Sequence, residues 1–170
     1  MNYAKSCLIV IAVGLLMQMS FAGDVTEKAL KASDMTAKIL PDKVFFRGQV
    51  ASVQTRNSGG VHFSDDAYVL AALVDSSGYS TDIRQKYQGY LLTEVPLDFG
   101  GQKLPAGAYG FGFVGGKFLI MDVGAHDILS LAAAKDAEMK RPVPLQMVSP
   151  SAGKYRLYAG KEYVDLSRAQ

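Results

Sequence analysis

Thiols are almost absent from this chain, because Cys7 is the single cysteine among 170 residues. A thiol nucleophile, a zinc–thiolate centre and an iron–sulfur cluster all need cysteine, so none of these sites is expected in the folded domain. A domain of this length buries enough surface to be stable without a disulfide, even in an oxidising compartment.

An excess of charge of one sign is lacking as well. The sequence has 18 Lys and Arg residues against 16 Asp and Glu residues, and loss of Lys5 with an N-terminal signal would leave 17 against 16. Proteins that bind nucleic acid or anionic membranes usually carry a basic excess. We therefore expect no nucleic-acid partner, and a small molecule or an envelope protein of unknown identity as the partner.

Specific catalytic and cofactor motifs are also missing. No G-x-S-x-G sequence occurs, which excludes the usual nucleophile elbow of a serine hydrolase. The glycine pairs 100–101 and 115–116 open no predicted helix and are not followed by Gly-Lys-Ser/Thr, so they do not predict a phosphate loop. No cofactor is expected, and a role without catalysis is favoured.

The sequence has only one long apolar run, and it lies near the N-terminus. Lys5 precedes the apolar stretch Leu8–Met17, and Ser20-Phe21-Ala22 places small residues at the −3 and −1 positions of a cleavage site. This pattern predicts a secretory signal peptide over residues 1–22, with cleavage after Ala22 and export to the periplasm or the cell exterior.

Two alternatives to a cleaved signal peptide can be weighed. An uncleaved membrane anchor needs about 20 apolar residues, and Gln18 interrupts this run before that length is reached. A lipid-modified cysteine would follow the apolar run, whereas Cys7 precedes it. Cleavage leaves no transmembrane segment in the mature chain.

The remainder divides into a leader and one β-domain. Val25, Ala29 and Leu30 recur at helical spacing before Pro41, which predicts a short helix in the leader over residues 23–42. A loose leader to the domain is the alternative. Residues 43–170 alternate in polarity with turn residues at regular intervals, which is typical of a single antiparallel β-sandwich or short β-barrel. Strands are expected near residues 43–47, 49–56, 61–64, 67–75, 89–99, 108–114, 117–124, 143–149, 154–159 and 162–167. Residues 126–140 fit either a strand or a helical turn.

The C-terminal hairpin over residues 155–166 can be predicted in register. With Gly160-Lys161 as a two-residue turn, Leu157 faces Val164 on one side and Arg156 faces Asp165 on the other. A shift by one residue would mix apolar and charged side chains on each face, so the pattern favours a single register.

A second hairpin, over residues 108–123, contains alternating glycines. With Gly115-Gly116 as the turn, Gly110 and Gly112 lie on one face of their strand, opposite Met121 and Leu119. Glycine weakens a strand, so this track needs a reason: cross-strand side chains that fold over it, or a ligand that approaches it. The ligand alternative gives a candidate binding site, formed by Arg84, Tyr87, Tyr90, Gly110 and Gly112.

Histidine and aspartate residues give an alternative metal or acid–base site. His62 precedes Asp65 and Asp66, and His126 precedes Asp127. Imidazole and carboxylate groups together bind zinc or iron, or transfer protons. Neither segment has H-E-x-x-H spacing, and Ser64-Asp-Asp is also common turn chemistry. This set predicts a secreted metal-binding protein or hydrolase, the alternative to a binding module.

One segment resembles a known group of proteins. Residues 100–113, GGQKLPAGAYGFGF, are similar to a segment of exported bacterial β-domain proteins whose function is unknown. Pro105 fixes the entry to its turn and Gly107 tolerates a positive φ before the next strand. Residues 142–148 and the C-terminal hairpin resemble small exported bacterial proteins in the same way. The resemblance implies an exported β-domain and no particular activity. We therefore expect an exported, non-enzymatic binding or envelope-associated module.

The export prediction can be tested by mass. The form of the protein recovered from the periplasm or the medium should begin at Gly23, because signal peptidase cuts after the small residue at −1. Intact-mass measurement of that fraction checks this directly. Full-length protein found only in the cytoplasm would contradict the predicted export.

Overall fold

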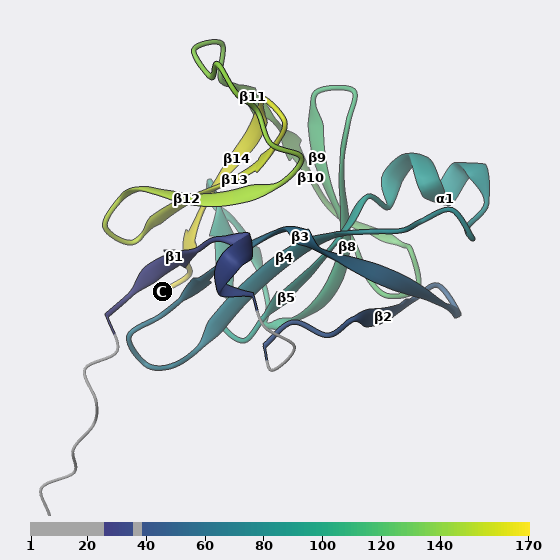
Figure 1. Cartoon of the computed structure of the whole chain (residues 1–170), viewed down its shortest axis with the longest axis horizontal. Coiled ribbons are helices and arrows are strands. Elements are labelled where there is room, and N and C mark those ends of the chain that lie inside the picture. Colours follow the sequence, from purple (N-terminus) through teal and green to yellow (C-terminus); the bar gives the residue numbers. More distant parts are fainter. Residues whose placement is uncertain (1–25, 36–38) are drawn as a thin grey trace, which may run out of the picture.

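The computed structural model of the protein describes residues 26–35 and 39–170, and the predicted signal peptide with its cleavage site lies outside this range. The described chain is mostly antiparallel β-structure in two sheets, neither of which closes on itself (Figure 1). The all-β prediction is therefore confirmed, with a sandwich-like arrangement of two open sheets.

The larger sheet has eight strands. Its order is β1 (Lys28–Leu30), β3 (Gln49–His62), β4 (Tyr68–Val74), β5 (Gly89–Thr93), β8 (Gly107–Val114), β9 (Lys117–Met121) and β10 (Asp127–Ala132), and β2 (Lys43–Phe46) also pairs with β3. Strand β4 lies inside this sheet, and the apolar residues on both of its faces are buried, apart from the half-buried Tyr68 and Leu73. A run that is apolar at odd and even positions thus forms a strand covered on two sides.

The smaller sheet has six strands. Its order is β12 (Gln146–Ser151), β13 (Lys154–Ala159), β14 (Glu162–Arg168), β6 (Leu97–Phe99) and β7 (Gln102–Leu104), and β11 (Ala134–Lys135) also pairs with β14. The ambiguous stretch 126–140 is therefore extended, since it contains β10 and β11. Helical structure is limited, within the described residues, to α1 (Thr81–Lys86) and the 3-10 turn η1 (Ala32–Asp34).

Both predicted hairpin registers are confirmed. In the C-terminal hairpin Leu157 pairs with Val164 and Arg156 with Asp165. The turn begins at Gly160, whose φ of 62° suits the first position of a type II′ turn. In the other hairpin Gly110 pairs with Met121, and the Gly115-Gly116 turn has φ values of 59° and 73°, as a type I′ turn requires.

The stretch expected as one strand over residues 89–99 is two strands in different sheets. β5 ends at Thr93 and β6 begins at Leu97, so the chain crosses from one sheet to the other at residues 94–96. Pro96 has no backbone N–H to donate to a neighbouring strand, so it does not fit inside a continuous ladder. In this crossing the Thr93 hydroxyl donates to the Val95 carbonyl at 2.5 Å. Odd-numbered residues stay buried throughout, because both strands face the space between the sheets.

The predicted leader is described only in part. Residues 28–30 pair with β3 as strand β1, and η1 follows at once. Leu30 is buried there, against Leu70 and Ala72 of β4. Other positions of the expected helix, including residues 24, 25 and 36–38, lie outside the described residues.

The core has three parts. The main cluster fills the space between the two sheets. The opposite face of the large sheet is covered by two smaller clusters, one from β2 and residues 79–87, the other from Leu30, Met35 and Leu40. Because the large sheet is covered on both sides, its glycine track lies under protein rather than under solvent.

Candidate functional site

The glycine track of β8 is occupied by the protein's own atoms. A Cβ on Gly110 would lie 2.4 Å from a ring carbon of Phe46, and a Cβ on Gly112 would lie 2.0 Å from the backbone carbonyl oxygen of Lys86. The predicted ligand groove along these glycines is therefore wrong. The expectation that Leu119 and Met121 alone cover the glycines is incomplete too, because the cover comes from β2 and from the segment after α1.

Tyr87, expected at the mouth of that groove, is instead a core residue. Its ring stacks on Phe46 with centroids 3.8 Å apart, and it has no exposed surface. Its hydroxyl has no hydrogen-bond partner among the described residues, and burial raises the pKa of this phenol. Tyr90 is half-buried and Arg84 is exposed on α1. These residues, although near in sequence, do not form an open site.

The first predicted histidine makes contacts within its own turn. The Nε2 atom of His62 lies 2.6 Å from Asp66, and its ring stacks on Tyr68 at a centroid distance of 4.2 Å. Asp65 instead forms an ion pair with Arg168 at 2.7 Å, and the hydrogen bond from this guanidinium lowers the pKa of the Asp65 carboxyl.

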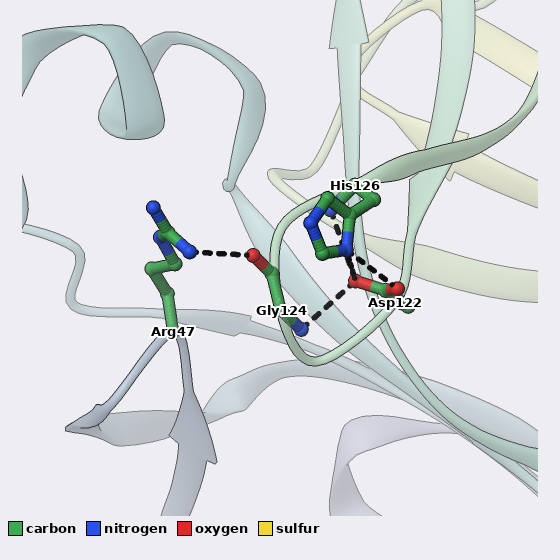
Figure 2. Close-up of polar contacts among 4 residues, drawn as sticks. All are labelled: Arg47, Asp122, Gly124 and His126. Atoms are coloured by element: carbon green, nitrogen blue, oxygen red, sulfur yellow. Dashed lines mark hydrogen bonds and ion pairs between the residues drawn. The ribbon is translucent and has the colours of Figure 1, made fainter.

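The second histidine lies elsewhere in the fold. His126 is in the turn between β9 and β10, and its Nδ1 lies 2.9 Å from Asp122 (Figure 2). Asp127, the neighbour expected to assist it, forms an ion pair with Lys86 at 2.8 Å. Strands β4, β5 and β8 lie between the strand of His62 and the strand that precedes His126. Within residues 26–35 and 39–170, no three His, Cys, Asp or Glu side chains are placed to hold a metal ion. The two histidines therefore do not share the predicted metal site.

Asp122 organises the turn that carries His126. One carboxylate oxygen accepts the backbone N–H groups of Gly124 and His126 at 2.8 and 2.9 Å. Ala125 adopts a positive φ of 68° in this turn. The hydrogen bonds from His126 lower the pKa of Asp122, so the carboxylate is charged down to a lower pH than an ordinary aspartate.

The ordered turn holds the β2–β3 hairpin in place. The backbone N–H of Arg47 donates to the Val123 carbonyl at 2.7 Å, and its guanidinium donates to the Gly124 carbonyl at 3.2 Å (Figure 2). A histidine held by a carboxylate is also the arrangement of a general base. The His126 side chain is 75% exposed, however, so water surrounds it and the geometry serves the turn rather than a dry reaction site.

A groove that the sequence analysis missed lies where the two sheets meet. It consists of two adjoining hollows of about 250 and 300 Å³, which share Ala32 and Arg56. Its walls come from the turn after β1, from the middle of β3 and from the segment that enters β12. The lining residues are Lys31, Ala32, Ser33, Thr55, Arg56, Ser58, Val143, Leu145, Gln146, Met147 and Val148.

A β-bulge directs Arg56 into this groove. The pairing of β3 with β4 shifts between Gln54 and Ser58, so residues 55–57 have no partner opposite them. The bulge is held by hydrogen bonds from Ser58 Oγ to the Thr55 carbonyl and from Asn57 to Gln54. Bulges reorient side chains and are frequent next to functional sites. The two strands expected at residues 49–56 and 61–64 are in fact one, because β3 continues through the residues between them.

The floor of the groove depends on one close approach between the sheets. A Cβ on Gly59 would lie 2.6 Å from the backbone nitrogen of Met147, so only glycine admits β12 this near to β3. Leu145 and Met147 are buried at this contact, whereas Val143 keeps 41% of its surface exposed at the rim. The result is an apolar hollow that is open on one side.

Comparison with known proteins finds no relative of this chain. The chain matches no protein-family model, no curated protein and no solved structure. The similarity of residues 100–113 to exported bacterial β-domains therefore stays a prediction. In the part of the chain that the structure describes, no helix has the length and apolar character to cross a membrane.

The role of Asp122 can be tested by amide exchange. Asp122→Ala removes the acceptor that orders the turn, so the Arg47 and Gly124 amides should exchange faster in the folded protein, with protection factors as the measurement. Protonation of Asp122 has the same effect on the wild type. Because folding lowers the pKa of Asp122, the stabilisation of the turn by this carboxylate is complete above the ordinary pKa of 3.8, and it is lost as the pH falls through the lower pKa of the folded protein.

Asp98→Ala is the matched control, since Asp98 accepts the Gly101 amide in a distant turn. Unchanged Arg47 protection in Asp122→Ala, or an equal loss in Asp98→Ala, would contradict the anchoring role.

Proposed function

We propose that the protein is an exported, non-enzymatic binding module of the cell envelope that holds a small organic ligand in the groove between β12 and the bulge of β3. The observation that carries this proposal is the form of the groove. An apolar hollow with a few polar groups at its rim, at the meeting of two packed layers, is the usual form of a small-molecule site. The export part of the proposal rests on the N-terminal signal pattern.

The placement of the candidate catalytic groups supports binding over catalysis. His62 and His126 each contact an aspartate four residues away, in separate turns, and the lining of the groove contains neither. The polar groups that line the groove are Ser33, Thr55, Ser58, Gln146 and the cations Lys31 and Arg56. Ser58 already donates its hydroxyl proton to the Thr55 carbonyl and is not activated by a neighbouring base. Hydrogen-bonding and charged groups of this kind orient a ligand.

Native mass spectrometry of the protein purified from the exported fraction of its own host tests the proposal. The wild type should carry a small molecule that is released on unfolding. Ala32→Trp should abolish it, because Ala32 lines both hollows and an indole would fill the space between them. Ala106→Trp is the matched control, since Ala106 is exposed on a loop away from the groove.

Both variants are first shown to unfold at the same urea concentration. A bound molecule retained in Ala32→Trp, or no bound molecule in the wild type, would contradict the proposed function.

A further inference from the structure

The charge around the groove is of one sign. Lys31 and Arg56 both line it, and the groove lining, as the described residues form it, includes no aspartate or glutamate. The two cations come from different elements, the turn after β1 and the bulge of β3. The nearest acidic group of that turn, Asp34, is engaged by the Lys31 backbone N–H at 2.8 Å. An anionic group entering the groove would therefore meet two positive charges.

The bulge fixes the backbone from which Arg56 enters the site. Three hydrogen bonds hold residues 54–58: Ser58 to Thr55, Asn57 to Gln54, and the Gln54 amide to the Val74 carbonyl at 3.2 Å. The backbone that carries Arg56 is thus held before any ligand arrives, which reduces the entropy lost on binding. The guanidinium also offers a planar pair of donors that matches a carboxylate.

The other wall of the groove is apolar. Val143, Leu145, Met147 and Val148 line it, and Val143 is one of the few large apolar side chains that remain exposed among the described residues. Burial of a hydrocarbon chain on this wall would remove apolar surface from water on both sides of the contact. The same hollow is lined by Lys31 and Arg56, so the polar and apolar parts of one ligand could each find a matching surface in it.

We propose that the ligand of this groove is an amphipathic carboxylate: a carboxylate group bound by Arg56 and Lys31, attached to a hydrocarbon chain that lies on Val143, Leu145 and Met147. This inference rests on the proposed function and specifies the chemical class of the ligand. Charge and apolar surface are both needed, since neither a bare anion nor a neutral chain uses the two walls together.

Three probes separate the two parts of this claim. Sodium octanoate has the charge and the chain, octan-1-ol has the chain alone, and sodium acetate has the charge alone. Titrations followed by the amide NMR signals of Ser58, Gln146 and Met147 should give an affinity for octanoate at least about tenfold higher than for either of the other probes. Octan-1-ol lacks the hydrogen bond to a charged group, and acetate lacks the apolar contact of the chain.

Substitutions test which residues bind the carboxylate. Arg56→Gln and Lys31→Gln should each weaken octanoate binding by about tenfold and leave the weak binding of octan-1-ol unchanged. Lys117→Gln is the control, because Lys117 is exposed at the distant β8–β9 hairpin and should alter neither affinity. Equal affinity for octanoate and octan-1-ol, no octanoate binding at millimolar concentration, or no effect of the two groove variants would overturn the assignment.

These experiments distinguish failure of the ligand assignment from failure of the proposed function. If octanoate does not bind while the co-purified molecule still depends on Ala32, the ligand class is wrong and the binding module stands. If Ala32→Trp retains the co-purified molecule, the groove itself is not the binding site.

Discussion

The two sheets can meet at the groove because one residue of β3 has no side chain. Gly59 lies against the backbone of β12, where even a methyl group would come within 2.6 Å of the Met147 nitrogen. This approach brings β12 beside β3 and β1, and it buries Leu145 and Met147 in the main core. The groove is a consequence of the same contact, since β12 is held close to β3 at Gly59 while the bulge at residues 55–57 departs from the ladder.

Glycines also allow close packing on the other face of the large sheet. Gly110 and Gly112 leave space on β8 that Phe46, Tyr87 and the Lys86 carbonyl occupy. Phe46, at the end of β2, therefore packs against β8, and the tip of the β2–β3 hairpin is held by the turn that Asp122 orders. One face of the sheet is sealed by glycine-permitted packing, whereas at Gly59 the same kind of approach occurs next to the β3 bulge and leaves a hollow open to solvent. The ligand proposal follows from this difference.

Much of the local structure could be predicted from the sequence, because short-range rules determine it. The two hairpin registers depend on alternating polarity and on glycine at the turn, and both are visible in a dozen residues. Burial alternates regularly over residues 89–99, as in the single strand that was expected there, although the chain changes sheet near Pro96. The alternation of apolar and polar residues indicates which side of a strand faces the core, but it does not indicate which sheet the strand joins.

The candidate sites were predicted less well, because they depend on long-range contacts. Gly110 is covered by Phe46, more than sixty positions away in the chain, and Gly112 is covered by the Lys86 carbonyl. His126 is flanked in sequence by Asp122 and Asp127, and only the structure shows that it contacts Asp122 while Asp127 pairs with Lys86. The groove residues come from three segments, and none carries a motif of its own. The Thr-Arg-Asn-Ser interruption in β3 was the one local signal, and it indicates a bulge as well as a turn.

The account depends most directly on the contact between Gly59 and β12, and urea unfolding of Gly59→Ala tests it. The added methyl group must displace β12, so the free energy of unfolding should fall by about 1–3 kcal/mol. Gly78→Ala is the matched control, because a Cβ there meets only the Gln49 side chain at an ordinary 3.6 Å. The account predicts that Gly59→Ala unfolds at a clearly lower urea concentration than Gly78→Ala, and equal midpoints would contradict it.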